Sequence, residues 1–382
     1  MTVKKLNRVK RVLLGILLLG ISVPLIQHVT GFSNVSGLWG AVDDKEPVPF
    51  SSKAWFDGSY QEGNEDYLNE AFGFRTSFVR LHNQVQFSLF SIPHANGVVI
   101  GKEWYLYEKN YIRAYYGQDF IGDSLIAQKT QKLKFIQEKL AESGKQIIVV
   151  LAPGKGSFFP EYFPDSMLST KSKTNYESYV EQFDLQQINH IDFNHWFLSE
   201  KGKLPHPLYA KGGIHWSKYG EILAADSMIR HIERISNRDL PNIVIDGFDV
   251  KAKNENGDYD IGKGMNLLFQ IPTYPMAYPR FHIAQPDKNT TRTLFVADSY
   301  YWGMYHYNFS QTVFGHGQFW FYNAEIYQDD LIASNHVANI NIREEVEKND
   351  VIVLMSTDAN LYNFAFGFID QLYEQYQIAD EQ

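Results

Sequence analysis

Apolar residues recur at helical spacing in three long segments of this chain. The pattern predicts an amphipathic helix over Leu68–Leu89 and a second helix from Ser124 to Ser143, which ends at Gly144. A third apolar-periodic run covers Ile222–Ile232. These helices are expected to pack one face against a core.

Continuous runs of β-branched and other apolar residues mark a second kind of element. The runs Gln146–Leu151, Leu294–Ala297 and Val351–Met355 are each followed by small and polar residues. Runs of this kind are typical of parallel strands buried on both faces. Together with the helices they predict an α/β fold, a parallel sheet flanked by helices, whose strands carry functional groups at their carboxyl ends.

A shorter pattern lies between the first two helices. Val98–Ile100 and Trp104–Leu106 are apolar and are separated by Gly101-Lys102. This spacing predicts a strand, a turn and a second strand.

The N-terminus has a different pattern, with a basic cluster directly before an apolar run. Val12–Ile26 is mostly apolar, and Val29–Phe32 extends it to the ~20 residues that a bilayer-spanning helix requires. The basic residues are Lys4, Lys5, Arg8, Lys10 and Arg11. They predict a cytoplasmic N-terminus. Because no small-residue cleavage site follows, we expect an uncleaved, single-pass inner-membrane anchor rather than a removed signal peptide.

The chain is therefore expected to have three parts. Residues 1–32 form the basic end and membrane anchor, and residues 33–53, rich in Gly, Ser, Asp and Pro, form a linker. Residues 54–382 form the folded domain, in the periplasm or extracytoplasmic space.

Composition and charge narrow the choice of partner. With 382 residues, 44% of them hydrophobic, the chain can bury one large core or two modest ones. The net charge of −9, without a basic block beyond the N-terminus, argues against nucleic-acid binding. The absence of cysteine excludes disulfides and cysteine nucleophiles.

Ser299 is the first candidate for chemistry. Asp298-Ser299-Tyr300 directly follows a predicted strand, so the serine hydroxyl lies on a turn whose backbone N–H groups can stabilise an oxyanion without a metal. The pair Asp-Ser alone is weak evidence, since Asp226-Ser227 repeats it inside a helical pattern.

His215 is the second candidate. It lies in Gly213-Ile214-His215-Trp216-Ser217, a loop that enters a helix, and its imidazole is suited to accept a proton from a serine hydroxyl. The His-Trp pair also occurs at His195, which we assign to a polar helix start.

Lys155 is the third candidate, in the glycine-containing loop after a buried strand. It is suited to bind a carboxylate or a sugar or acyl oxygen, and the alternative is a solvated turn lysine. The spacing does not fit a nucleotide-binding loop. His190 and His195 are out of step on a helix, so the sequence predicts neither a metal nor another cofactor.

Taken together, these motifs resemble the SGNH-hydrolase-like domain of the alginate O-acetyltransferase family, which acts in bacterial polysaccharide acetylation. As in that family, the His-Trp block precedes the serine block. Further similar segments, in chain order, are Phe72–Arg75 with Arg80, Val98–Leu106, Pro153 and Lys155 with Pro160–Tyr162, and His215–Ser217 with Gly220.

The resemblance implies a domain that transfers acetyl groups to an exopolysaccharide hydroxyl. A membrane-bound O-acyltransferase partner would supply these acetyl groups. Ser299 would carry the acyl group and His215 would be the general base. A carbohydrate acetyl esterase with the same pair and a non-catalytic glycan-binding scaffold are the alternatives.

One position departs from the family. The aspartate that usually stands two residues before the histidine is replaced by Gly213. The site is then either a Ser/His dyad, with a backbone carbonyl orienting the ring, or takes an acid from elsewhere, for which Asp192 and Asp298 are the candidates.

Aromatic residues accompany both motifs. Trp216, Tyr300 and Tyr301 have faces on which sugar rings can stack, and the alternative is ordinary core packing.

Overall fold

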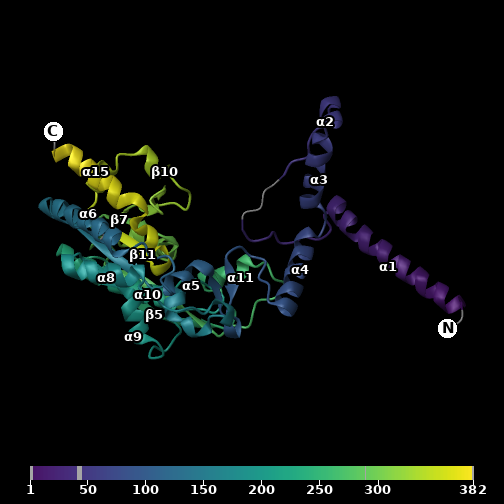
Figure 1. The fold of residues 1–382 in the computed structure, drawn as a ribbon, viewed down its shortest axis with the longest axis horizontal. Helices are drawn as coiled ribbons and strands as arrows, with labels where there is room; N and C mark the ends of the chain where they lie inside the picture. Colours follow the sequence, from purple (N-terminus) through teal and green to yellow (C-terminus); the bar gives the residue numbers. More distant parts are fainter. Residues whose placement is uncertain (1–2, 41–44, 289, 381–382) are drawn as a thin grey trace. The chain divides into compact units, whose positions relative to one another are not determined.

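The computed structural model describes residues 3–40, 45–288 and 290–380. The chain divides into two compact units, one of residues 1–96 with 262–270 and one of residues 97–261 with 271–382. The sequence predicts one domain over 54–382, whereas residues 54–96 group with the N-terminal unit. Figure 1 shows the elements of both units.

The first unit is helical. Its elements are α1 (Val3–Thr30), α2 (Ser52–Asp57), α3 (Ser59–Ala71) and α4 (Arg75–Phe90). The distant segment 262–270 belongs here because α4 binds its backbone. Asn83 Nδ2 donates to the Met265 carbonyl at 3.0 Å, and Gln84 Oε1 accepts from the Phe269 N–H at 3.1 Å.

The single helix predicted over Leu68–Leu89 is wrong, because α3 and α4 are separate helices. Phe74 has a left-handed backbone with φ 57°, which ends helical geometry. A Cβ on Gly73 would lie 1.9 Å from the Pro24 carbonyl oxygen, so only glycine fits at the break.

Within α1, residues Arg8–Thr30 are long and apolar enough to cross a membrane, by length and composition. The apolar N-terminal helix predicted from the sequence is therefore present. Of the predicted linker, residues 41–44 lie outside the described residues, as do the ends of the chain at 1–2 and 381–382.

The second unit is built on a seven-stranded sheet in the order β10-β9-β8-β7-β11-β3-β4. Strands β8, β7, β11, β3 and β4 are parallel, and β9 and β10 continue the sheet antiparallel. The bounds are β3 (Gln146–Ala152), β4 (His190–Asp192), β7 (Thr293–Ala297), β8 (Phe319–Phe321), β9 (Glu325–Tyr327), β10 (Asn335–His336) and β11 (Val351–Thr357). The three strands predicted from the sequence are confirmed as β3, β7 and β11.

Helices cover both faces of this sheet. One core joins alternate residues of β3, β7 and β11 to α6 (Asp123–Glu142), α8 (Asn175–Gln186) and α15 (Phe368–Asp380), which lie together in Figure 1. On the other face the Phe295 ring stacks on Tyr301 with centroids 4.0 Å apart. Burial on both sides explains the unbroken apolar runs of the strands. The predicted α/β class is confirmed.

The remaining helices of this unit are mostly short. They are α5 (Lys109–Tyr115), α7 (Lys155–Phe158), α9 (Phe193–Glu200), α10 (Lys218–Ser236), α12 (Trp302–His306), α13 (Phe309–Thr312) and α14 (Ile342–Val346), together with α11 (Asp260–Gly264), of which only the first two residues belong to this unit. The helix predicted over Ile222–Ile232 lies within α10.

Two antiparallel hairpins complete the fold. β1 (Val98–Ile100) pairs with β2 (Leu106–Glu108), so the second predicted strand begins two residues later than expected. β5 (Asn242–Lys251) pairs with β6 (Met276–Ala284). The residues that connect β5 to β6 include α11, which carries an acid of the site described next.

Candidate functional site

The turn after β7 presents Ser299. Asp298 caps the short 3-10 helix Ser299–Tyr301, and its Oδ1 accepts from the Tyr300 N–H at 3.1 Å. Its Oδ2 accepts from the Thr357 N–H at 2.8 Å and from Asn360 Nδ2 at 2.9 Å. Asp298 is fully buried. This carboxylate therefore fixes the turn that holds the serine hydroxyl at the carboxyl edge of the sheet.

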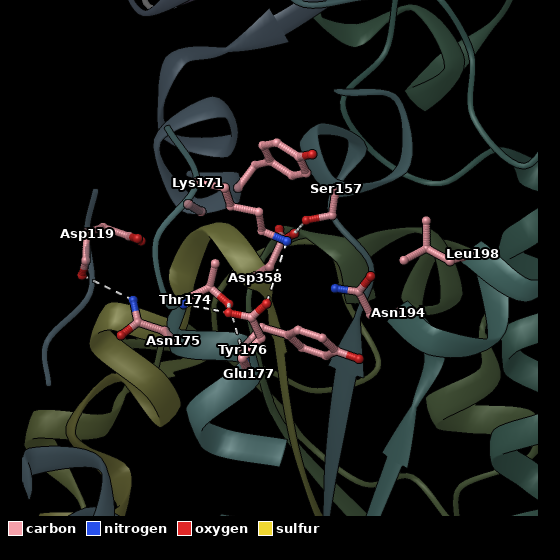
Figure 2. Close-up of a pocket in the computed structure, with 12 residues that line it drawn as sticks. Asp119, Ser157, Lys171, Thr174, Asn175, Tyr176, Glu177, Asn194, Leu198 and Asp358 are labelled. Carbon is pink, nitrogen blue, oxygen red and sulfur yellow. Dashed lines mark hydrogen bonds and ion pairs between the residues drawn. The ribbon is translucent and has the colours of Figure 1, made fainter. Parts of the chain in front are cut away.

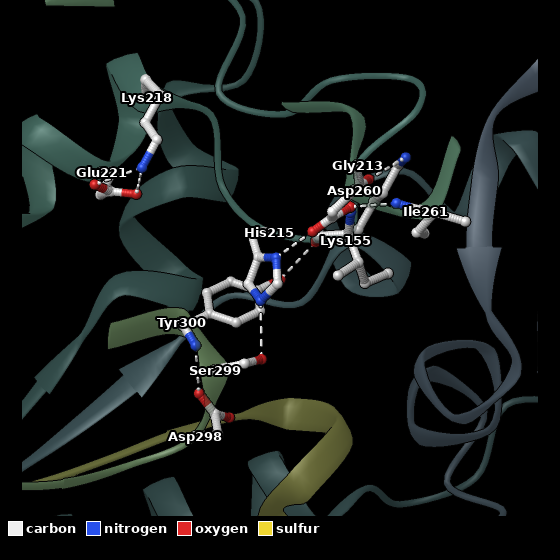
Figure 3. A network of polar contacts seen from close by, with 11 residues as sticks. Lys155, Gly213, His215, Lys218, Glu221, Asp260, Ile261, Asp298, Ser299 and Tyr300 are labelled. Carbon is white, nitrogen blue, oxygen red and sulfur yellow. Dashed lines mark hydrogen bonds and ion pairs between the residues drawn. The ribbon is translucent and has the colours of Figure 1, made fainter. Parts of the chain in front are cut away.

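His215 approaches this hydroxyl from the loop before α10. Ser217 caps α10, since its hydroxyl accepts from the Gly220 N–H at 3.0 Å, and this fixes the loop that precedes the helix. His215 Nε2 lies 2.8 Å from Ser299 Oγ (Figure 3). The structure thus brings the two residues proposed from separate motifs into hydrogen-bonding contact.

Asp260, at the start of α11, contacts the other side of the imidazole. Its Oδ2 accepts a hydrogen bond from His215 Nδ1, and its Oδ1 accepts from the Ile214 N–H at 2.9 Å and the Ile261 N–H at 2.6 Å. The side chains of His215 and Asp260 remain 23% and 24% exposed. The three groups form a Ser-His-Asp arrangement that a substrate can reach.

Neither acid named from the sequence takes this position. Asp298 holds the serine turn, as described above. Asp192 caps α9 by accepting from the His195 N–H at 2.8 Å, and it also accepts from the Tyr176 hydroxyl at 2.7 Å. Both carboxylates are therefore engaged elsewhere, and the orienting acid is a residue that the motifs did not identify.

Charges around the site act on the imidazole. Burial lowers the pKa of His215, but the carboxylates of Asp260, Asp298 and Glu108 raise it by more, so the pKa lies above its ordinary value. Burial and then the charge of Asp260 raise the pKa of Glu108, while His215 lowers it. Glu108, on β2, is thus a second acid whose charge acts on the imidazole, and the sequence did not single it out.

Lys155 does not face a substrate. Its side chain is fully buried, and its Nζ donates to the carbonyls of Lys211 and Gly213, both at 2.7 Å. Burial holds the pKa of this ammonium well below its usual range. The lysine therefore fixes the backbone of the loop that carries His215, and the proposed contact with an acyl or sugar oxygen is wrong.

The aromatic side chains near the motifs also belong to the core. Trp216 and Tyr300 are 1% exposed and Tyr301 is 0% exposed, so none offers a face to a sugar ring. The Tyr300 hydroxyl donates to the Ile214 carbonyl at 2.7 Å. Tyr300 and Lys155 thus both bind backbone carbonyls of the histidine loop.

A tyrosine that the sequence analysis missed lies beside the serine. Tyr322 follows β8 and has a left-handed backbone. Burial and then Asp298 raise the pKa of its hydroxyl, whereas hydrogen bonding with the side chains of Ser299 and Asn360 lowers it. No local motif marks Tyr322, because only the sheet order brings β8 next to β7.

One known protein family matches the segment of the chain that carries Ser299, His215 and Asp260. The family model described as SGNH hydrolase-like domain, acetyltransferase AlgX, matches residues 98–299, more than half of the chain. No functionally curated protein matches the chain.

Several solved structures are similar at low sequence identity. The O-acetyltransferase domain of Pseudomonas putida AlgJ is 15% identical, with 73% of this chain and 99% of that chain covered and a TM-score of 0.48. Pseudomonas aeruginosa AlgX is 16% identical, with 72% of this chain and 67% of that chain covered and a TM-score of 0.42. Bacillus cereus PatB1 is 12% identical, with 71% of this chain and 99% of that chain covered and a TM-score of 0.45.

Proposed function

Because the chain belongs to the family of AlgX-type SGNH hydrolase-like acetyltransferase domains, we propose that it is an extracytoplasmic polysaccharide O-acetyltransferase that works through a serine acyl-enzyme. The observation that carries this proposal is the contact of 2.8 Å between His215 Nε2 and Ser299 Oγ, with Asp260 on the opposite ring nitrogen. This is the arrangement that a serine nucleophile needs.

The first half of the proposed reaction acetylates the enzyme. His215 Nε2 takes the proton of Ser299 as Oγ attacks the acetyl carbonyl carbon of the donor. The bond between the acetyl group and the donor breaks, and the donor's leaving group takes the proton from Nε2. Asp260 holds the proton on Nδ1, so the lone pair of Nε2 faces the serine.

The second half transfers the acetyl group. A sugar hydroxyl gives its proton to His215 Nε2 and attacks the carbonyl carbon of the acyl-serine. The ester bond to Ser299 Oγ breaks, and Oγ recovers the proton from Nε2. Water in place of the sugar would give acetyl esterase activity with the same groups.

The proposal also assigns the other parts of the chain. Residues 1–32 anchor the protein in the inner membrane by a single pass, residues 33–53 form a linker, and the sheet-containing unit lies in the periplasm or extracytoplasmic space. A membrane-bound O-acyltransferase supplies the acetyl group across the membrane. The apolar helix Arg8–Thr30, with its basic N-terminal flank, supports this topology.

The test compares acetyl transfer by the full chain and its variants. Wild type should cleave 4-nitrophenyl acetate and acetylate an added oligosaccharide, and Ser299→Ala and His215→Ala should lower the rate by about 10³-fold or more. Ser227→Ala and His195→Ala are matched controls, since they change the same residue types in the repeated Asp-Ser and His-Trp pairs.

Each other outcome has a distinct meaning. Serine-dependent cleavage without sugar acetylation would favour the esterase. Equal rates of ester cleavage for wild type and all four variants would exclude catalysis by this site, and the glycan-binding scaffold would be the remaining function.

A further inference from the structure

A polar pocket lies over the carboxyl ends of strands next to β7, apart from the triad. Its cavity measures about 110 Å³ and opens to solvent, and because one water needs roughly 10–15 Å³ of such volume, it has room for several polar groups of a ligand. Its lining includes Ser157 of α7 after β3, Asn194 of α9 after β4 and Asp358 after β11 (Figure 2). These strands follow β7 in the sheet, so the pocket and Ser299 share one edge.

Asn194 is a buried amide turned into this pocket. The residue is 2% exposed, and no other described residue forms a hydrogen bond with its side chain. The atoms of its amide are not closed off from solvent, so a ligand or water in the pocket can reach them. Figure 2 shows it directed toward Asp358. A buried amide without a protein partner costs free energy unless a ligand or water satisfies it.

The floor of the pocket is a carboxyl group with a serine beside it. Ser157 Oγ donates to Asp358 Oδ2. Burial raises the pKa of Asp358 to about 7, and the hydrogen bond from Ser157 lowers it. The other oxygen, Asp358 Oδ1, is closed off from solvent, so a sugar hydroxyl would meet this pair at Asp358 Oδ2 and Ser157 Oγ, whose lone pairs accept hydrogen bonds.

The walls of the pocket carry aromatic rings and an ion pair. Tyr115 and Tyr176 line it, and Lys171 Nζ lies 4.9 Å from the centroid of the Tyr115 ring and 3.6 Å from a carboxylate oxygen of Glu177. Tyrosine rings can stack on the C–H face of a sugar, while amides, hydroxyls and carboxyls bind its edge.

The charge of the pocket selects among sugars. Its described lining contains three carboxyl groups, Asp119, Glu177 and Asp358, and one ammonium group, Lys171, which is already paired with Glu177. Glu177 is balanced by Lys171, so a uronate carboxylate would meet the like charge of Asp119 and of the ionised fraction of Asp358, whereas an uncharged or amino sugar would not.

We propose that this pocket binds an uncharged or amino sugar unit of the acceptor polysaccharide, a few units away from the hydroxyl that receives the acetyl group. The proposal rests on the proposed function. Adjacent parallel strands lie about 4.8 Å apart, so a polysaccharide that runs along the carboxyl edge can occupy the pocket while another unit reaches Ser299.

The test is a titration of the full chain, in lipid nanodiscs, with defined oligosaccharides and no acetyl donor. The probes are tetrasaccharides of glucose, galactose, mannose, N-acetylglucosamine and glucosamine, and tetragalacturonate as the charged counterpart. At least one uncharged or amino tetrasaccharide should bind at least tenfold more tightly than tetragalacturonate.

Variants link this binding to the pocket. Asn194→Leu should weaken it by about tenfold, the effect of one lost hydrogen bond. Leu198→Trp should weaken it by filling the pocket from an exposed position that lines it, which keeps the test valid if Asn194→Leu misfolds. Asn339→Leu, an exposed asparagine on another element, should bind as wild type.

The proposal is overturned if no uncharged or amino tetrasaccharide binds, if tetragalacturonate binds as tightly, or if both pocket variants bind as wild type. This readout needs no acetyl group. If Ser299→Ala cleaved the ester as fast as wild type, the proposed function would be contradicted. The sugar titration would still show whether the pocket binds a sugar.

Discussion

The carboxylate on the His215 ring comes from a residue 45 positions further along the chain. Asp260 accepts hydrogen bonds from two backbone N–H groups and from the imidazole N–H, and these bonds stabilise its ionised form. An acid held in this way fixes the ring orientation and stabilises the imidazolium that forms during proton transfer. The ring geometry that we propose for catalysis therefore depends on Asp260.

We expect Asp260→Asn to slow ester cleavage by about 10²- to 10⁴-fold and to change its pH dependence. Activity requires neutral imidazole, so the rate rises with pH through the pKa of His215. Asp260 is the main group that raises this pKa, so its neutralisation should move the midpoint of the profile to lower pH. The rate of 4-nitrophenyl acetate cleavage between pH 5 and 9, corrected for spontaneous hydrolysis, measures both effects.

Asp287→Asn, at an exposed carboxyl on another element, is the control and should keep both the rate and the midpoint. An Asp260→Asn profile with an unchanged midpoint would contradict the role of Asp260 in setting the pKa.

Single residues also mark the limit of prediction from the sequence. Ser299 and His215 could be proposed because each follows a recognisable local signal, a strand end and a helix entry. Lys155 was proposed as a binding residue for the same reason, but its side chain is buried and donates hydrogen bonds to two backbone carbonyls. Local sequence shows where a side chain starts, but packing decides what it faces.

At the scale of elements, the tandem glycines Gly212-Gly213 explain how a distant acid reaches the histidine. A Cβ on Gly213 would lie 2.3 Å from the Gly257 carbonyl oxygen, and a Cβ on Gly212 would lie 2.4 Å from the Tyr259 ring. The β5–β6 connection thus occupies the space that side chains at these positions would fill. Position 213 therefore has no room for an aspartate side chain, and the segment that fills this space supplies Asp260 to the histidine instead.

Gly213→Ala should therefore lower kcat by about 100-fold, because small displacements of a positioned group have effects of this size. The new Cβ meets backbone atoms of Gly257 and Asp258, so the segment that carries Asp260 must move. The midpoint of the pH profile should fall with kcat, as for Asp260→Asn. Steady-state kinetics of ester cleavage across pH provide the measurement.

Gly257→Ala is the matched control, since a Cβ there meets no atom within 4 Å. It should retain wild-type kcat. Equal kinetics for Gly213→Ala and wild type would show that the close approach of the two segments does not position the acid.

The elements themselves were predictable to different degrees. Strands β3, β7 and β11 could be identified because burial on both faces leaves only apolar residues in them. The break between α3 and α4 could not, since the apolar spacing continues across Phe72–Phe74 and only the close approach of Pro24 to Gly73 shows why the helix stops. The β5–β6 hairpin was also not predicted, because most of its residues are exposed or half-exposed and do not alternate with a clear apolar face.

At the scale of the whole molecule, the two units divide the chain differently from the sequence. Helices α2 to α4 were expected in the same domain as the sheet, yet they group with α1 and with residues 262–270. A contact between residues 182 positions apart, such as Asn83 with Met265, leaves no trace in local periodicity. The chain crosses between the two units at 96/97, 261/262 and 270/271, and the second crossing comes directly after the segment that carries Asp260.

The proposed topology is testable because the chain contains no cysteine, so a single introduced cysteine reports its own position. Lys203→Cys lies on an exposed part of the sheet-containing unit, and Lys10→Cys lies in the exposed basic flank of α1. In spheroplasts, a membrane-impermeant maleimide should label Lys203→Cys at once and Lys10→Cys only after permeabilisation, because the basic flank stays in the cytoplasm. Release of Lys203→Cys protein as a shorter soluble form would instead indicate a cleaved signal peptide. Immediate labelling of Lys10→Cys, or protection of Lys203→Cys, would contradict an extracytoplasmic active site, since the polysaccharide hydroxyls that it is proposed to acetylate would then lie on the other side of the membrane.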